Sequence, residues 1–236
     1  MPSTSDVVAE RVLSEVAPPL RVLDLGLLPY RQALERQREM ARARIAGTLT
    51  EDVLILVEHP PVVTIGRSRG ARHLIATPDT LAARGVEVVE VERGGDVTFH
   101  GPGQLVGYPI MDLKRPPHRQ DLHWYLRQIE QALIDVLMTF GIPATRRTGL
   151  TGVWTNGRKI ASIGVHARDW VTWHGFALNV STDLSFFDLI VPCGIAGVDM
   201  TSIARERGGQ PPDPDAVRRA AAAAFASTFG LAAADD

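Results

Sequence analysis

The sequence contains a single cysteine, Cys193, whose neighbours favour a thiol that is presented for chemistry. Cys193 lies between Pro192 and Gly194, a setting typical of a turn rather than of a packed strand. Turns at strand ends commonly carry reactive groups, and a thiolate is a strong nucleophile. The alternative is that Cys193 is a small buried hydrophobic residue, as lone cysteines usually are.

A lysine, Lys159, interrupts a largely apolar run directly after the dipeptide Asn156-Gly157. Asn-Gly between two β-rich runs is a strong hairpin signal, so we expect Lys159 at the beginning of a strand. On the period of a strand, Ser162 and Gly164 share one face, and their small size indicates that another backbone or a ligand packs closely there. The alternative for Lys159 is an edge-strand residue that guards against aggregation.

A third segment, Arg93 to Gln104, holds four glycines in the run RGGDVTFHGPGQ. Glycine lets a backbone approach a ligand closely and adopt positive φ, so this run is a candidate binding loop. It matches neither the P-loop nor the GxGxxG fingerprint, and nucleotide binding does not follow from it. The alternative is a tight turn between two strands.

Two histidines, His100 and His174, are the remaining candidates for chemistry. With Cys193 either of them could form the thiol–imidazole pair of a hydrolase, although the sequence around Cys193 lacks the papain signature. A metal site has little support because no pair of candidate ligands has a recognisable spacing. A single cysteine also excludes an internal disulfide and a multi-cysteine metal site within the chain.

The bulk composition narrows the class of protein. The chain has 236 residues, 45% of them hydrophobic and 22% charged, with a formal net charge of −2. Neither sign of charge dominates, so nothing argues for a nucleic acid or a membrane surface as partner. No signal peptide and no apolar run long enough to span a bilayer is recognisable. We therefore expect a cytoplasmic protein.

Hydrophobic periodicity predicts helices mixed with strands. The expected helices are 30–46, 77–85, 121–140 and 213–228, with Asp121 as N-cap and Gly141 as stop signal of the third. The expected strands are 21–25, 53–57, 62–65, 86–92, 104–113, 153–155, 158–165 and 171–180. The order lacks a regular βαβ alternation, which favours an α+β fold: a single domain with a mixed β-sheet flanked by helices. We expect a loose extension over residues 1–19 and one domain over residues 20–236.

Taken together, these segments resemble one family. The runs RGGDVTFHGPGQ, GRKIASIGVHAR, HGFALNV and VPCGI are similar to those of the lipoyl(octanoyl) transferases, and EHPPVVTIGR and the later TSI also fit. The resemblance extends from about Leu20 to Phe229, and the joint occurrence of the runs is far more specific than any one of them. It implies the fold shared by biotin and lipoate protein ligases.

The resemblance also implies a reaction and its partners. It implies transfer of an octanoyl group from acyl carrier protein to a lysine of lipoyl domains, in 2-oxoacid dehydrogenase E2 subunits and in the glycine cleavage H protein. Neither ATP nor a metal ion is then expected, because a thioester donor is already activated.

Residue roles follow from matching positions in the same motifs. Cys193 matches the nucleophile that carries the acyl group as a thioester, and Lys159 matches the lysine that lowers the pKa of that cysteine. Three stretches match the substrate-binding positions: Arg93, Gly94, Gly95, Asp96, Val97, Thr98, Phe99 and His100; Ser162, Ile163 and Gly164; Gly175, Phe176 and Ala177.

Three other functions stay open at this point. An ATP-dependent lipoate–protein ligase would share the fold, but it would need no nucleophilic thiol. A non-catalytic module that binds acyl groups or their carrier would have no use for Lys159 together with Cys193. A thiol hydrolase that uses His100 or His174 would release the free acid instead of modifying a protein.

Overall fold

The computed structural model describes residues 17–67, 70–192 and 197–234. The strands are β1 (Pro19–Leu27), β2 (Asp52–Glu58), β3 (Val62–Ile65), β4 (Glu87–Glu90), β5 (Val97–His100), β6 (Gln104–Ile110), β7 (Thr145–Arg147), β8 (Leu150–Thr155), β9 (Arg158–Arg168), β10 (Val171–Asn179) and β11 (Ala232–Ala234). The α-helices are α1 (Tyr30–Ala46), α2 (Pro78–Ala83), α3 (Leu122–Thr139), α4 (Ile203–Glu206) and α5 (Pro214–Phe229), and short 3-10 helices cover Gly70–His73 and Leu184–Leu189.

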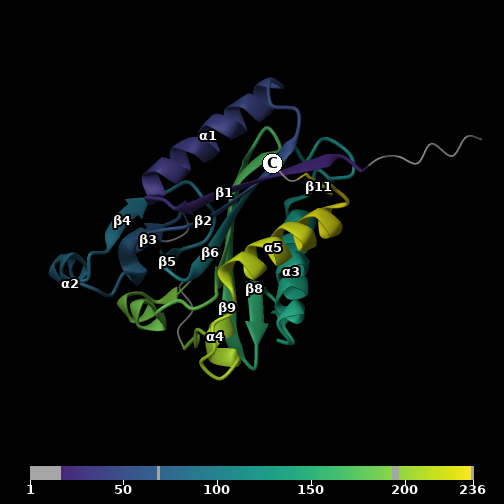
Figure 1. Cartoon of the computed structure of the whole chain (residues 1–236). Coiled ribbons are helices and arrows are strands. Elements are labelled where there is room, and N and C mark those ends of the chain that lie inside the picture. The colour runs from purple at the N-terminus through teal and green to yellow at the C-terminus, as the bar shows by residue number, and fades with distance from the viewer. Residues whose placement is uncertain (1–16, 68–69, 193–196, 235–236) are drawn as a thin grey trace, which may run out of the picture.

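The strands form two sheets. The larger has eight strands in the order β11-β1-β2-β6-β10-β9-β8-β7, and the smaller has three in the order β4-β3-β5. In the larger sheet β1 pairs in parallel with both β2 and β11, whereas the pairs from β2 to β7 are antiparallel. The predicted single domain with a mixed sheet and flanking helices is therefore confirmed (Figure 1).

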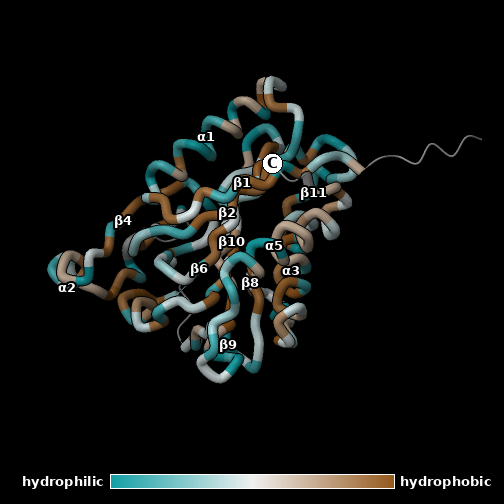
Figure 2. Tube along the Cα trace, in the orientation of Figure 1, coloured by the Kyte–Doolittle hydropathy of each residue, from teal (hydrophilic) through white to brown (hydrophobic). Residues whose placement is uncertain are grey.

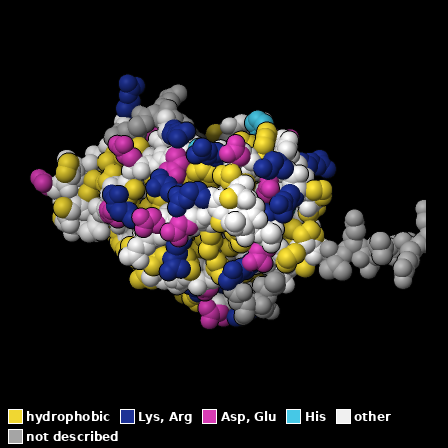
Figure 3. Space-filling model, turned by 90° about the horizontal axis from the view of Figure 1, so that it is seen from above, with side chains coloured by type: hydrophobic (Ala, Val, Ile, Leu, Met, Phe, Trp, Pro, Cys, Tyr) yellow, Lys and Arg dark blue, Asp and Glu magenta, His cyan; other side chains and the backbone are white. Residues whose placement is uncertain are grey.

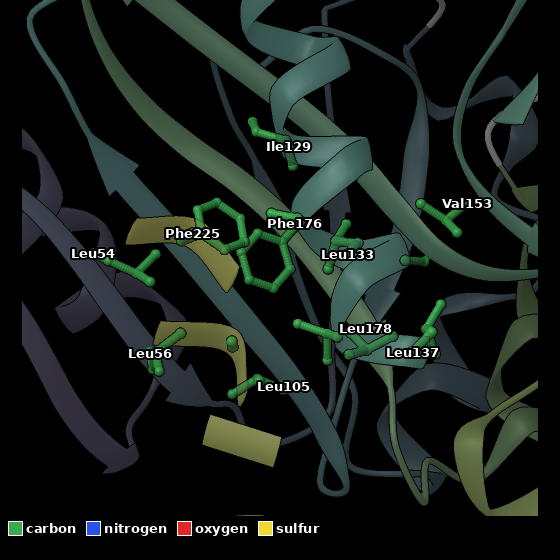
Figure 4. Close-up of a cluster of buried hydrophobic side chains, with 14 of the residues drawn as sticks. Leu54, Leu56, Leu105, Ile129, Leu133, Leu137, Val153, Phe176, Leu178 and Phe225 are labelled. Atoms are coloured by element: carbon green, nitrogen blue, oxygen red, sulfur yellow. The ribbon is translucent and has the colours of Figure 1, made fainter. Parts of the chain in front are cut away.

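Helices cover both faces of the larger sheet (Figure 1). One face packs against α3 and α5, with Leu54, Phe176, Leu133 and Phe225 among the side chains in contact (Figure 4). The other face packs against α1, because alternate residues of β2 and β6, such as Val53 and Val106, point that way. The inner strand β2 is accordingly hydrophobic along most of its length (Figure 2).

Capping explains where the long helices begin and end. The Asp121 side chain accepts hydrogen bonds from the backbone N–H groups of His123 and Trp124, at 2.8 and 3.2 Å, as its predicted role as N-cap requires. Gly141, just past the end of α3, has a φ of 74°.

The outer face of α1 is polar, and basic and acidic side chains are interspersed over the surface seen from above (Figure 3).

The Asn-Gly hairpin is also confirmed. Asn156 and Gly157 have φ of 47° and 80°, and they join β8 to β9. Two consecutive positive φ values are the mark of the type I′ turn that this dipeptide favours. Lys159 therefore lies one residue inside β9, beside the turn.

The predicted N-terminal extension, residues 1–19, falls largely on residues 1–16, which lie outside the described residues. The first strand, β1, begins at Pro19, slightly earlier than the predicted strand 21–25. Among the described residues, no helix is both long enough and apolar enough to cross a membrane.

Candidate active site

A cavity of about 190 Å³ lies between the two sheets. Strand β5 of the smaller sheet and the loop that precedes it line one side, and β6, β9 and β10 of the larger sheet contribute to the other. Its lining is a mixture of apolar and polar groups. The lining residues are Tyr30, Arg93, Gly95, Asp96, Val97, Thr98, His100, Val106, Tyr108, Gly149, Leu150, Thr151, Lys159, Ser162, Ile163, Gly164, His174, Gly175, Phe176 and Ala177.

The three stretches expected to bind substrate thus converge on one cavity. Two of their members, Gly94 and Phe99, are not in its lining. Phe99 points away from the cavity and stacks on Phe186, with ring centroids 4.6 Å apart. The predicted nucleophile, Cys193, lies outside the described residues, so its role stays a prediction.

Lys159 is buried in the wall of the cavity, with 1% of its surface exposed. Its ammonium nitrogen lies 5.2 Å from the centre of the Trp154 ring, which is within the range of a cation–π interaction. Lys159 pairs with Trp154 of β8 on one side and with Met200 on the other, so it is not an edge-strand residue, and that alternative is wrong.

Gly152, on β8, makes room for the Lys159 side chain. Its φ is 131°, and a Cβ at this position would lie 2.8 Å from Cε of Lys159 and 2.7 Å from the carbonyl oxygen of Ala161. The backbone N–H of Gly152 donates to a carboxylate oxygen of Glu130 at 3.1 Å, and Glu130 is fully buried. The hydrogen bond to Glu130 therefore fixes β8, the strand next to Lys159, to helix α3.

The loop before β5 approaches β9 backbone to backbone. The N–H of Gly94 donates to the carbonyl of Val165 at 2.9 Å, and a Cβ on Gly164 would lie 3.0 Å from the carbonyl oxygen of Gly94. The close packing expected at Gly164 is thus with another backbone. Arg93 donates to the carbonyl and hydroxyl oxygens of Thr64, at 2.8 and 2.9 Å, which ties the loop to β3.

His100 is part of a buried hydrogen-bond network. Its Nδ1 is 2.8 Å from the side-chain oxygen of Gln104, whose amide donates at 2.9 Å to the side-chain oxygen of Asn179. Burial, reinforced by the neighbouring His59, lowers the pKa of His100 to about 3. His100 is therefore neutral at physiological pH and a weak base.

His174 is the second buried histidine in the cavity lining. Its φ of 57° is rare for a residue with a side chain, and neither ring nitrogen has a hydrogen-bond partner among the described residues. Nε2 lies 3.9 Å from a carboxylate oxygen of Glu92, too far for a hydrogen bond. Burial lowers the pKa of His174, and Glu92 only partly offsets that effect.

Within the described part of the chain, no group of three or more His, Cys, Asp and Glu side chains is arranged to hold a metal ion. Several cavity residues carried no local signal in the sequence. Tyr30 comes from α1 and Tyr108 from β6, whereas Gly149 and Thr151 flank the beginning of β8. Only the fold brings these segments together.

Comparison with known sequences decides the family. Residues 29–226 match the sequence profile of the lipoyl protein ligase A/B catalytic domain, which is most of the chain. The chain belongs to this family. The octanoyltransferase of Gloeobacter violaceus is 48% identical over 210 residues, covering 89% of this chain and 90% of that protein. The octanoyltransferase of Geobacter metallireducens is 50% identical over 206 residues, covering 87% and 92%.

These relatives confirm the predicted resemblance to the lipoyl(octanoyl) transferases, and they make this lipoyl protein ligase A/B family member an acyltransferase. Its fold is also that of solved lipoate–protein ligases. A lipoate-protein ligase A bound with ATP superposes with a TM-score of 0.71 at 18% identity, over 94% of this chain and 89% of that chain. A bi-partite lipoate protein ligase from Thermoplasma acidophilum gives a TM-score of 0.72 at 19% identity, over 94% and 87%. The predicted ligase-like fold is therefore confirmed.

Proposed function

We propose that this acyltransferase moves an octanoyl group from octanoyl-acyl carrier protein to a specific lysine of lipoyl domains in 2-oxoacid dehydrogenase E2 subunits and the glycine cleavage H protein. The acyl group is carried as a thioester on Cys193. The observation that carries this proposal is the buried Lys159 in the wall of a partly apolar cavity, in a chain about half identical to octanoyltransferases. A cytoplasmic location belongs to the same proposal.

The proposed role of Lys159 is to stabilise the Cys193 thiolate. A free thiol has a pKa of about 8.5, so only a few per cent is ionised at neutral pH, and a nearby ammonium group raises that fraction. The segment Asp199–Thr201 runs beside Lys159: the N–H of Lys159 donates to the carbonyl of Asp199 at 2.8 Å. Asp199 is six positions beyond Cys193 in the sequence, a separation that is compatible with the proposed contact between lysine and thiol.

The reaction would proceed in two acyl transfers. In the first, the Cys193 thiolate attacks the carbonyl carbon of the donor thioester, a new C–S bond forms, and the carrier thiolate leaves. In the second, the acceptor lysine attacks the octanoyl-cysteine, the amide C–N bond forms, and the Cys193 thiolate leaves. In the first transfer Lys159 would give its ammonium proton to the departing carrier thiolate. In the second, the resulting neutral amine would accept the proton that the acceptor amine loses. Each donor is already a thioester, so the proposed reaction uses neither ATP nor a metal ion.

The cavity would hold the octanoyl chain. Val106, Ile163 and Ala177 line it from three neighbouring strands and would bury methylene groups, each contributing about 0.8 kcal/mol. Ala177 lies opposite both Val106 and Ser162 in the sheet, and Ser162 is three residues beyond Lys159 on β9. At about 3.3 Å per residue, the cavity extends roughly 10 Å from Lys159 to this level.

A hydrolase that uses His100 or His174 has less support. Burial lowers the pKa of both imidazoles, His100 to about 3, so neither is suited to take a proton from a thiol at neutral pH. His100 is in addition engaged by Gln104 through Nδ1. Lys159 is the better partner for a thiol in this cavity.

The decisive experiment is the intact mass of the protein after incubation with octanoyl-acyl carrier protein. We expect a gain of one octanoyl group that hydroxylamine removes and that Cys193→Ser prevents. Addition of a lipoyl domain should then discharge the adduct and increase the mass of the lipoyl domain by the same group. Absence of an adduct, with lipoyl-domain modification only when ATP and free fatty acid are supplied, would establish a ligase instead.

A further inference from the structure

The beginning of β9 has an unusual partner. On one side Lys159 pairs with Trp154 of β8, but on the other the partner is the segment Asp199–Thr201 and not β10. The N–H of Lys159 donates to the carbonyl of Asp199 at 2.8 Å, and the N–H of Thr201 donates to the carbonyl of Lys159 at 2.9 Å. The segment Asp199–Thr201 therefore takes the place of a strand beside the lysine.

Thr201 is the junction of this pairing, and it is fully buried. Besides its N–H, its carbonyl accepts a hydrogen bond from the Asn179 side chain at 2.9 Å. Asn179 in turn belongs to the network that reaches His100 in the cavity through Gln104. The Thr201 hydroxyl donates a hydrogen bond to a carboxylate oxygen of Glu206.

Glu206, at the end of α4, connects Thr201 to the other side of Lys159. Its carboxylate accepts two hydrogen bonds from Arg158 Nη2, at 2.9 and 3.0 Å, and one from Asn156 at 2.9 Å. Asn156 and Arg158 are the turn residue and the strand residue that immediately precede Lys159. The Glu206 side chain is 4% exposed, so its carboxylate is largely withdrawn from water, whereas the Arg158 side chain is 32% exposed.

The carboxylate of Glu206 is ionised under physiological conditions. Burial alone would raise the pKa of Glu206, but the hydrogen bonds from Thr201, Asn156 and Arg158 outweigh burial and lower it. A charge-assisted clamp of this kind has stronger and shorter hydrogen bonds than neutral groups provide. It fixes the β8–β9 turn and the Asp199–Thr201 segment to each other, with Lys159 between them.

We infer that Glu206 and Thr201 are positioning residues for the acyl transfer: they lock Lys159 in register with the segment Asp199–Thr201. This inference rests on the proposed function, since it assigns the clamp to the distance between ammonium and thiol. Neither residue lines the cavity, so neither is expected to touch the acyl group. Loosening the clamp should leave substrate binding intact and weaken the step that needs the thiolate.

The test uses the full chain with Thr201→Val, which keeps the shape but removes the hydroxyl, and Glu206→Gln, which removes the charge. Thr201→Ser restores the hydroxyl and is the rescue variant. Glu87→Gln is the matched control, because Glu87 forms an ion pair with Arg31 on the exposed surface, outside the cavity lining. For each variant we would measure kcat and KM of octanoyl transfer.

A second readout is the rate of Cys193 alkylation by iodoacetamide at about pH 7 relative to about pH 10, which reports the thiolate fraction at the only cysteine of the chain. We expect Thr201→Val and Glu206→Gln to lower kcat about tenfold with KM unchanged, and to lower this ratio. We expect Thr201→Ser and Glu87→Gln to behave like the wild type.

The outcomes separate the inference from the function on which it rests. If Lys159→Met lowers the alkylation ratio but Thr201→Val and Glu206→Gln do not, the clamp has no positioning role and the proposed function stands. If the wild-type ratio is that of free cysteine and Lys159→Met leaves it unchanged, the proposed chemistry fails and the clamp inference fails with it.

Discussion

Replacement of Gly152 by alanine should damage catalysis through Lys159, although Gly152 carries no functional group. The new Cβ would lie 2.8 Å from Lys159 Cε and 2.7 Å from the Ala161 carbonyl oxygen, both closer than packed atoms allow. The carbonyl belongs to the backbone of an interior strand and cannot yield easily. The lysine side chain is the softer neighbour, so we expect it to be displaced.

Two effects can be given magnitudes. A φ of 131° is rarely adopted by a residue with a side chain, and such strain costs about 1–3 kcal/mol of folding free energy. A displacement of Lys159 by about 1 Å could reduce the rate of transfer by about 100-fold. The loss of activity should therefore exceed what the loss of stability explains.

The assay pairs urea unfolding with the rate of octanoyl transfer, both on Gly152→Ala and on Gly141→Ala. Gly141 has a φ of 74°, and a Cβ added to it would have no neighbouring atom within 4 Å, so alanine there introduces strain without a contact. We expect both variants to lose stability and only Gly152→Ala to lose most of its transfer activity. Wild-type transfer by Gly152→Ala would refute the reasoning.

Three further predictions concern the same cavity and its surroundings. Lys159→Arg keeps the charge but cannot accept a proton at neutral pH, so it should form the octanoyl adduct yet deliver it to the lipoyl domain about 100-fold more slowly; unchanged delivery in a single-turnover assay would rule out Lys159 as base. Val106→Ala should shift the preferred donor toward longer acyl chains, by about fourfold for each methylene that the enlarged cavity buries, and a competition between octanoyl and decanoyl donors followed by mass measures this. Burial lowers the pKa of His59 to about 4 and of His100 to about 3, so the unfolded chain binds protons that the native chain does not. The free energy of unfolding should thus be at its full value above about pH 6.5 and be lower by roughly 2 kcal/mol per histidine at about pH 5. Urea titrations at several pH values should show a smaller decrease for His59→Asn than for the wild type. An equal decrease in the two proteins would contradict this account.

Much of the fold could be predicted because local signals were strong. Helix α1 matches the predicted range 30–46, and β3 matches the range 62–65. Short strands were missed where glycine obscured the pattern: β5, Val97–His100, lies inside the glycine-rich run and pairs with β3 to form the smaller sheet. The existence of a second sheet depends on long-range pairing, which periodicity does not reveal.

The candidate site also has a part that the sequence predicted and a part that it did not. The motifs located the binding stretches in sequence, and the fold brings most of them to one cavity. The supporting contacts were beyond the reach of the sequence, because Glu130 and Glu206 look like ordinary helix-surface acids until their burial is known. The same holds for Gly152, whose role depends on the path of one lysine side chain.

The parallel pairing of β1 with β11 has a consequence for how the chain is made. Residues 19–21 pair with residues 232–234, so the beginning of β1 stays unpaired until the ribosome has synthesised the chain as far as β11. An exposed strand edge is a template for association with other chains during that interval. A nascent chain that stalls before β11 leaves this end of β1 unpaired, and it is the form in which aggregation should begin.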